Sequence, residues 1–414
     1  MNILFITENL PYPVDTGGKI RSYNIIRGLS RHNDVILLST YTSEDQLGYA
    51  DIFNELCAQV HLVKKKKRSL PRLAYIVLSN IFSRFPLLVK QHYNKSLSNK
   101  IRELIRDESL HIDAVHFDHL DSSVYLEQIN DSTHKILDEH NIVTNQIITS
   151  YNVQNNPLLR LLLKSQISKT MRYEGNTASC MDMNLVCSSD DKRYLREFTD
   201  TANITVIPNG VDIEYFSQPQ STYPPGLPDL DKGKTLVFVG TLDYGPGETA
   251  VSYFLEEIFP LLQTEDKDFK FIAVGQNPSR RLLKMSSDNI IFTGRVDDIR
   301  PYVSAASIFV VPLLSGSGTR LKILDAMAMK IPVVSTSIGA EGLTVNHEKD
   351  IMLADSPEDF ARSISILCNN HELQNTLIDN GFKLVSDQYA WEIVWNSLDE
   401  VYGSLDKIIK EDSK

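Results

Sequence analysis

The strongest constraint on the fold is a regular alternation of short apolar runs with longer helical patterns. The runs are rich in Val, Ile, Leu and Phe, as β-strands buried on both faces are. They read "ILFIT", "DVILLST", "AQVHLV", "DAVHF", "HKILDEH" and "MNLVCSS", then "TLVFVG", "FKFIAVG", "NIIFTG", "SIFVVP" and "IPVVST". Strands separated by helices predict α/β architecture, with parallel, doubly wound sheets covered by helices on both faces.

The length predicts two such domains, because single cores stop growing well below 414 residues. Composition shifts to Pro, Gly and polar residues around "ITVIPNGVDIEYFSQPQSTYPPGLPDLDKGK", which we interpret as the linker. We therefore predict one domain over 1–205, a second over 206–388, and an amphipathic helix in 389–414 whose aromatic face must dock. Ligands of tandem doubly wound domains bind in a cleft at the carboxyl ends of the strands.

Charge and cysteine usage exclude several classes of protein. A net charge of −11 and a pI near 5.4 argue against nucleic acid as a partner. The cysteines are scattered without metal-ligand spacing, which predicts a reducing compartment and no zinc site: Cys57, Cys180, Cys187 and Cys368. "MNILFIT" has no signal-peptide features, and no apolar run reaches transmembrane length, so we expect a cytoplasmic protein.

The stretch "GSGTRLKILDAMAMKIPVV", residues 316–334, predicts a phosphate site. A Gly-rich turn joins a strand ending near Val311 to a helix, and helix N-termini present free N–H groups and a positive dipole to anions. Arg320 and Lys322 add positive charge there, and Asp325 one turn later suits sugar hydroxyls. A capped helix with a surface salt bridge is the alternative interpretation.

Three further stretches follow strands of the first domain. Gly17 and Gly18 in "DTGGKI" allow close backbone approach to a diphosphate or acceptor, or form an ordinary turn. In "AVHFDHLDS", His119 lies just past a strand and suits a reacting group, whereas His116 is the better candidate for packing. Glu139 in "LDEHN" either lines the acceptor side with His116 or is a solvated carboxylate.

Two other motifs carry alternatives. The basic run Lys64–Arg68 before an apolar-basic segment either lies on an anionic membrane surface or is a solvated charge run. Asp229 and Asp231 match a D-x-D metal motif by letters, but they lie in the Pro-rich linker, so we predict no metal. "GTLDYGPGE" has P-loop spacing without Gly-Lys-Ser/Thr, and we reject a Walker A site.

Four separated segments together resemble a known enzyme family. "FITENLPYPVDTGGKIRSYNIIRGLS", "IPNGVDIEYF", "VGTLDYGPGETAVSYFLEEIFPLL" and "FTGRVDDIRPYVSAASIFVVPLLSGSGTRLKILDAMAMKIPVVSTSIGAEGL" are similar to retaining GT-B glycosyltransferases of family 4, the glycosyl transferases group 1 type. The resemblance implies a GT-B fold of two Rossmann-like domains facing across a cleft. It also implies a nucleotide-sugar donor on the second domain, an acceptor on the first, and a terminal helix packing back on the first through Trp391 and Trp395.

The resemblance also assigns residues. It implies that Arg320 and Lys322 stabilise the leaving phosphate, that His119 is the active-site histidine, and that Asp325 replaces the glutamate that binds ribose. The first glutamate of the family's E-x7-E pattern falls at Ser317 and is missing. Cations usual after the first strand of the second domain are also missing, and Arg320 and Lys322 are candidates to compensate. The implied donor-binding set is Gly17, Gly18, Thr241, Val296, Ser317, Gly318, Thr319, Arg320, Lys322 and Asp325.

The function we expect is sugar transfer, with retention, from a nucleoside diphosphate to a hydroxyl of a saccharide, lipid-linked saccharide or small metabolite. We expect the reaction to belong to polysaccharide biosynthesis and to need no cofactor. The inner face of the membrane is a further expected location, besides the cytoplasm. A nucleotide-sugar 2-epimerase and a catalytically silent GT-B binding protein remain alternatives, the latter because of Ser317.

Overall fold

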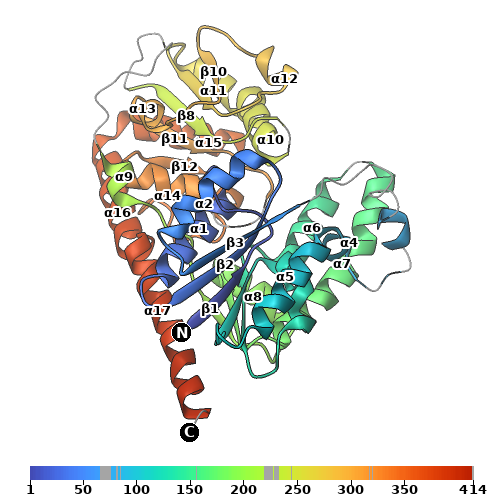
Figure 1. Cartoon of the computed structure of the whole chain (residues 1–414). Helices are drawn as coiled ribbons and strands as arrows, with labels where there is room; N and C mark the ends of the chain where they lie inside the picture. The colour runs from blue at the N-terminus through green and yellow to red at the C-terminus, as the bar shows by residue number, and fades with distance from the viewer. Residues whose placement is uncertain are drawn as a thin grey trace. The chain divides into compact units, whose positions relative to one another are not determined.

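The computed structural model describes residues 1–412 except 66–75, 81, 82, 84, 155, 219–226, 228–232, 244, 317 and 319. Contacts divide the chain into two units (Figure 1). Unit 1 comprises Met1–Pro208 and Val394–Lys414, and unit 2 comprises Asn209–Ile393. The predicted domain boundaries, after residues 205 and 388, lie a few residues before these.

Unit 1 is built on a seven-stranded parallel sheet in the order β3-β2-β1-β4-β5-β6-β7. Its strands are β1 (Asn2–Ile6), β2 (Asp34–Tyr41), β3 (Gln59–Lys64), β4 (Ala114–Asp118), β5 (His134–Glu139), β6 (Met183–Val186) and β7 (Ile204–Val206). Its helices are α1 (Gly17–Leu29), η1 (Glu44–Tyr49), α2 (Ala50–Asn54), α4 (Leu87–His92), α5 (Lys95–Arg106), η2 (Leu120–Gln128), α6 (Val143–Val153), α7 (Pro157–Ser179) and α8 (Ser189–Arg196).

Unit 2 has a six-stranded parallel sheet in the order β10-β9-β8-β11-β12-β13. Its strands are β8 (Thr235–Val239), β9 (Lys270–Val274), β10 (Ile290–Gly294), β11 (Ile308–Val311), β12 (Val333–Ser335) and β13 (Met352–Leu353). Its helices are α9 (Ile213–Ser217), α10 (Pro246–Tyr253), η3 (Phe254–Ile258), α11 (Phe259–Glu265), α12 (Arg280–Leu283), α13 (Arg300–Ser304), α14 (Leu321–Ala328), η4 (Ile338–Ala340), α15 (Pro357–Asn369) and α16 (His371–Gln388). The final helix, α17 (Trp391–Asp412), starts in unit 2 and continues in unit 1.

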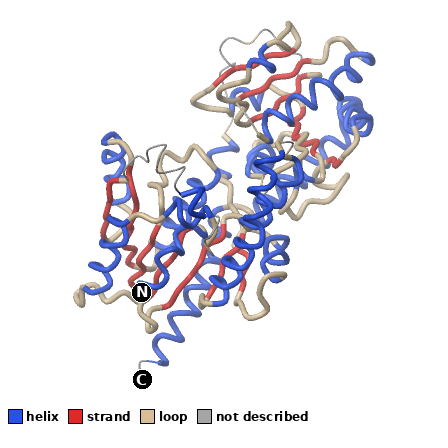
Figure 2. Tube along the Cα trace, turned by 90° about the vertical axis from the view of Figure 1, so that its right-hand side faces the viewer, coloured by secondary structure: helices blue, strands red, loops and turns tan. Residues whose placement is uncertain are grey.

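Each unit has its own core, because its strands are apolar on both faces and helices cover them (Figure 2). Phe238, Phe254 and Phe271 are fully buried in unit 2, and Phe5 and Phe117 in unit 1. The predicted fold class, two Rossmann-like parallel α/β domains, is confirmed.

The terminal helix docks through its aromatic residues. Trp395 donates a hydrogen bond from Nε1 to the Asn24 carbonyl oxygen at 2.8 Å, and its ring lies where a Cβ at Gly28 would come within 2.4 Å. Trp391 lies equally close to Gly210 in unit 2, where a Cβ would be 2.5 Å from the ring. Each tryptophan therefore needs a glycine opposite it.

Candidate functional site

The strand order of unit 2 reverses between β8 and β11, and Lys322 lies at that point. Ligands of doubly wound sheets bind where the order reverses, at the carboxyl ends of the strands. From the first turn of α14, the Lys322 Nζ atom lies 4.4 Å from the centre of the Phe238 ring. It also lies 2.8 Å from the position that a Cβ at Gly240 would occupy. A cation carried by α14 thus occupies the end of β8.

The loop after β8 depends on glycines for its path. A Cβ at Gly275 would come 1.7 Å from the Gly240 carbonyl oxygen, and one at Gly247 would come 2.0 Å from the Thr241 carbonyl oxygen. Larger residues would therefore push this loop away from the sheet. Thr241, after β8, is exposed, and Val296, after β10, is half-buried. Both lie at the same edge of the sheet as Lys322.

The turn before α14 folds around the Arg320 side chain. Gly316 and Gly318 have φ of 124° and 82°, which favour glycine. A Cβ at Gly316 would lie 2.8 Å from the Arg320 Nη2 atom, so the guanidinium packs against this glycine. The predicted donor residues Ser317 and Thr319 lie outside the described residues.

Burial disfavours the charged forms of the ionisable side chains at the start of α14 and on its first turns. Burial and the nearby Arg320 charge together lower the pKa of Lys322 to about 8, and Asp325 opposes this shift. Burial raises the pKa of Asp325 to about 7, opposed by Lys322, and lowers the pKa of Arg320. A diphosphate bound here would favour the charged form of Lys322.

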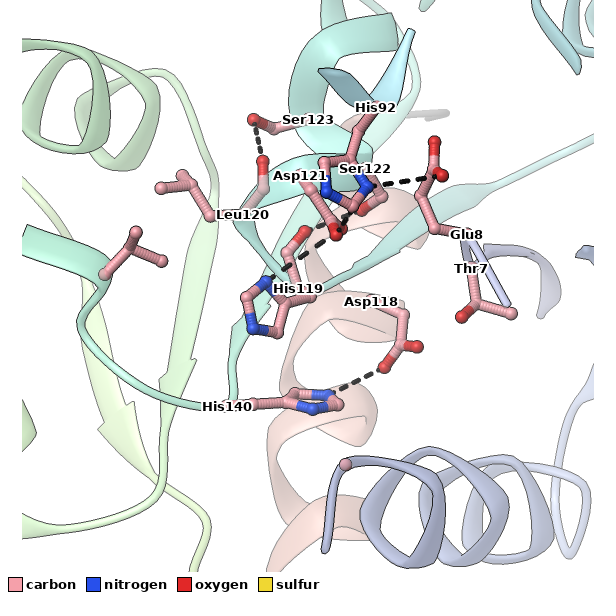
Figure 3. Close-up of polar contacts among 12 residues, drawn as sticks. Thr7, Glu8, His92, Asp118, His119, Leu120, Asp121, Ser122, Ser123 and His140 are labelled. Atoms are coloured by element: carbon pink, nitrogen blue, oxygen red, sulfur yellow. Dashed lines mark hydrogen bonds and ion pairs between the residues drawn. The ribbon is translucent and has the colours of Figure 1, made fainter. Parts of the chain in front are cut away.

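In unit 1 the order reverses between β1 and β4, and two histidines lie at the neighbouring strand ends (Figure 3). His119 follows β4 in a left-handed conformation, φ 75°, and His140 follows β5. Their rings are 5.2 Å apart and nearly perpendicular. Since parallel strands end at one edge, the side chains that follow β4 and β5 come together.

The two histidines have opposite acid–base character. The His140 Nε2 atom lies 2.8 Å from an Asp118 oxygen, and Ser22 Oγ donates to the same carboxylate at 2.8 Å. Burial alone would lower the pKa of His140, but the Asp118 carboxylate raises it above the usual value. Burial lowers the pKa of His119, whose Nδ1 lies 3.9 Å from Asp121. The structure therefore favours a charged His140 beside a neutral His119.

One of the two predicted glycines, Gly18, lies beside His140. Helix α1 begins at Gly17, and a Cβ at Gly18 would lie 3.6 Å from His140 Nδ1. The first turn of α1 carries no acidic residue, so its free N–H groups keep their positive potential.

A second polar group lies beside the histidines (Figure 3). Glu8, after β1, is 2% exposed and accepts a hydrogen bond from Lys65 Nζ at 2.9 Å. The His92 Nδ1 atom lies 3.3 Å from Glu8 and 3.1 Å from Asp121. The carboxylates of Glu8 and Asp121 therefore flank the His92 imidazole.

The structure buries both residues predicted for the acceptor side, and both are 0% exposed. His116 stacks on Phe5, with ring centres 4.4 Å apart, and its Nδ1 lies 2.6 Å from the Tyr402 hydroxyl oxygen. Glu139 faces Glu174, which accepts hydrogen bonds from the N–H groups of Val143 and Thr144. A bound acceptor molecule would therefore contact neither of these side chains.

One group of described residues has metal-ligand character: His116, Asp118 and Asp138, whose ligand atoms lie within 4.8 Å of one another. Arg21 occupies this place, because its guanidinium donates to Asp138 at 2.6 and 3.0 Å. That positive charge opposes a cation, and Asp118 already accepts from Ser22 and His140. Asp229 and Asp231 of the D-x-D motif lie outside the described residues.

Sequence reasoning missed the partners of His119. They are His140 and Asp121, together with Asp118, which contacts His140, and His92, which contacts Asp121. The sequence did carry a signal for His140, because this histidine directly follows a strand, as His119 does, and that position was the reason for choosing His119. The sequence carried no signal for His92, because α4 is separated from the sheet edge by sequence and meets it only in the fold.

Comparisons with known proteins show what the chain is similar to. Residues 233–370 match the model of the family described as glycosyl transferases group 1. An uncharacterized 44.6 kDa protein in the cps region of Klebsiella pneumoniae is 23% identical over 96% of this chain and 98% of its own length. The capsular polysaccharide biosynthesis glycosyltransferase CapM of Staphylococcus aureus is 28% identical over 34% of each chain.

Two solved structures share the fold across nearly the whole chain. Sucrose-phosphate synthase from Thermosynechococcus elongatus has a TM-score of 0.71 at 17% identity, covering 99% of this chain and 100% of that one. Anabaena HepE, solved with UDP and glucose, has a TM-score of 0.65 at 14% identity, covering 98% and 100%. The fold is that of GT-B glycosyltransferases.

Proposed function

We propose that the protein transfers a sugar from a nucleoside-diphosphate donor, held by unit 2, to an acceptor hydroxyl, held by unit 1. The observation that carries the proposal is Lys322, a half-buried cation at the strand-order reversal beside Gly240. The group 1 match over this same unit supports a transferase. Retention of configuration and membership of family 4 follow from the sequence resemblance and belong to the proposal.

The cations of α14 would act on the leaving diphosphate. Bond cleavage places negative charge on the phosphate, and preorganised cations stabilise that charge more in the transition state than in the ground state. Lys322 lies against the loop after β8, where the family's usual cations are missing. This position supports the idea that Lys322 compensates for them from the neighbouring helix.

The histidine pair would act on the sugar and the acceptor. His140, held by Asp118, is suited to donate a hydrogen bond to an oxygen of the transferred sugar. Neutral His119 is suited to accept one from a hydroxyl. In the retaining course we propose, the acceptor attacks the face that the phosphate leaves, and the phosphate takes the acceptor proton.

The acceptor would be a saccharide, a lipid-linked saccharide or a small metabolite, and no metal or other cofactor takes part. The capsular name of CapM and the cps-region relative support a role in polysaccharide biosynthesis. The proposed location is the cytoplasm or the inner membrane face. Of the basic run suggested for membrane contact, only Lys64 and Lys65 lie within the described residues.

A two-stage experiment tests the function. Thermal shifts across nucleotide sugars identify the donor, because a ligand that binds only the folded state raises its stability. Transfer of that sugar to an acceptor panel is then measured for the wild type, Arg320→Ala and the exposed control Arg280→Ala. We expect Arg320→Ala to lose about 2–4 kcal/mol of transition-state stabilisation and the control to lose none.

The other outcomes identify the alternatives. Donor binding without hydrolysis or transfer would indicate a silent binding protein. Isomerisation of the donor without an acceptor would indicate a 2-epimerase. Wild-type turnover of Arg320→Ala would remove this residue from the site.

A further inference from the structure

The hairpin of α6 and α7 exposes four apolar side chains, which we call the apolar tip. Val153 is 59% exposed, Leu158 77%, Leu159 48% and Leu161 67%. Single exposed leucines are ordinary, but apolar side chains gathered on adjacent turns mark an interaction surface. The tip is therefore a candidate docking surface.

The charge around the apolar tip is the reverse of the charge of the whole protein. The chain has 53 Asp and Glu among 414 residues, yet none lies between His140 and Tyr173. The same stretch carries four cations, Arg160, Lys164, Lys169 and Arg172. A second stretch, residues 56–102, also lacks any acidic residue and contains several lysines and arginines.

Described parts of the two acid-free stretches pack together in unit 1 (Figure 1). The Leu87 N–H at the start of α4 donates to the Gln166 side chain of α7 at 2.8 Å. Lys169 Nζ donates to the Asn80 carbonyl oxygen at 2.6 Å. The 51%-exposed ring of Phe85 packs edge-on against Tyr173, with centres 6.2 Å apart. Apolar and cationic side chains therefore share one flank of the unit.

We propose that the apolar tip docks this flank on an anionic lipid bilayer. The exposed leucines enter the headgroup boundary, and exposed Arg160 and Lys164 meet lipid phosphates. A protein of net charge −11 is repelled by an anionic surface unless its cations are segregated, as they are here. A second copy of the chain would present the same cations and repel this flank. Among the described helices, none is long and apolar enough to cross a membrane.

Docking would also place the sheet edge near the lipid. Helix α6 starts three residues after His140, and its 11 residues span about 16 Å to the apolar tip. Of the acceptor classes in the proposed function, this distance between the sheet edge and the apolar tip best suits a lipid-linked saccharide. This consequence rests on the proposed transfer, whereas the docking does not.

Sedimentation of the full chain with vesicles tests the docking without donor or acceptor. The vesicles are equal parts phosphatidylcholine and phosphatidylglycerol, with pure phosphatidylcholine as the comparison. We expect binding to the anionic vesicles alone, weakened by salt, and at least a fivefold loss of the partition coefficient in Leu158→Glu/Leu161→Glu. Leu283→Glu in unit 2, where the leucine is 49% exposed, is the matched control and should bind as the wild type.

A milder variant and an oligomer measurement complete the test. Leu158→Ala/Leu161→Ala keeps the helix and the charges, and it should lose binding while melting as the wild type does. Equal binding of wild type and both tip variants would overturn the proposal. Concentration-dependent dimerisation that the tip variants abolish, without vesicle binding by the wild type, would assign the tip to a second copy instead.

Discussion

Lys322 is the residue whose chemistry is most constrained by its surroundings. Its ammonium lies over an aromatic ring and beside Arg320, and burial lowers its pKa to about 8. A bound diphosphate would raise that pKa, so binding takes up a proton whenever the free lysine is neutral. The affinity for diphosphate is therefore full below the free-state pKa and is lost as the pH rises above it.

We predict that the affinity of a nucleoside diphosphate is constant from about pH 7 to about pH 8 and then falls towards tenfold per pH unit. Lys322→Met should bind more weakly and lose this pH dependence, whereas exposed Lys284→Met should keep both. Calorimetric titration across the range, in buffers of different ionisation enthalpy, measures affinity and proton uptake together. A flat wild-type profile would contradict the assignment of Lys322 to the phosphate.

Asp325 has two conceivable roles that one comparison separates. As a ribose ligand it should contribute about 1.5–3 kcal/mol to nucleoside diphosphate binding, as hydrogen bonds to a charged group do. If Asp325 instead only favours the charged form of Lys322, it should contribute equally to the binding of any diphosphate.

We predict that Asp325→Ala weakens the binding of a nucleoside diphosphate by that amount. The same variant should weaken the binding of inorganic pyrophosphate by much less. Asp325→Glu should retain binding, because it restores the carboxylate usual in the family. Titration of both ligands into wild type and both variants gives the result. Equal losses for the two ligands would assign Asp325 to charge support alone.

Strand β5 directs its two acidic residues, Asp138 and Glu139, to opposite faces of the sheet. Successive side chains point to opposite faces, so Asp138 meets Arg21 while Glu139 meets Glu174. Burial raises the pKa of Glu139 well above its usual value and that of Glu174 to about 7. A carboxyl group whose pKa is higher in the folded state than in the unfolded state stabilises the protein at a pH below its unfolded-state pKa. This contribution is lost as the pH rises through its folded-state pKa.

We predict that the free energy of unfolding falls between about pH 5 and pH 8, with the Glu174 shift from 4.5 to about 7 contributing ~3 kcal/mol. Glu139→Gln should raise the melting temperature at pH 8 and flatten this fall, because a neutral amide avoids the burial penalty. Denaturant unfolding at several pH values provides the measurement. Transfer activity should persist if Glu139 is structural, whereas an acceptor-side role predicts its loss.

The whole chain combines an acidic surface with cationic sites at particular places. The described residues of unit 2 supply cations at the strand-order reversal, and in unit 1 Arg21 occupies the group with metal-ligand character. In the proposed donor site, Lys322 and Arg320 would neutralise the diphosphate without a metal ion. This arrangement leads to a prediction about the intact protein.

We predict that donor binding and transfer survive chelation by EDTA. Lys322, Arg320 and the backbone dipoles supply the positive potential that a divalent ion would otherwise supply. Activity is measured in chelator, then after adding magnesium or manganese, with the melting temperature as a control for folding. Loss in EDTA and recovery with metal would show that the charge assignment is wrong.

The alternation of apolar runs was enough to predict two parallel α/β sheets, because strand and helix patterns are local properties of the chain. The Gly-rich turn that leads from Gly316 to Arg320 and the helix carrying Lys322 and Asp325 were predicted for the same reason. Their roles in binding stay predictions. The sequence could not show that Lys322 lies beside Gly240, because that closeness depends on two strands far apart in the chain becoming neighbours.

Burial and partnership required the folded molecule. His116 and His119 look alike in sequence, yet strand alternation buries the first against Phe5 and the turn after β4 brings the second to His140. Glu139 could be a surface carboxylate until β5 is seen to be covered by α7, which carries Glu174. The pattern along a chain specifies which elements form, whereas register and packing between distant elements set which side chains meet and which keep their charge.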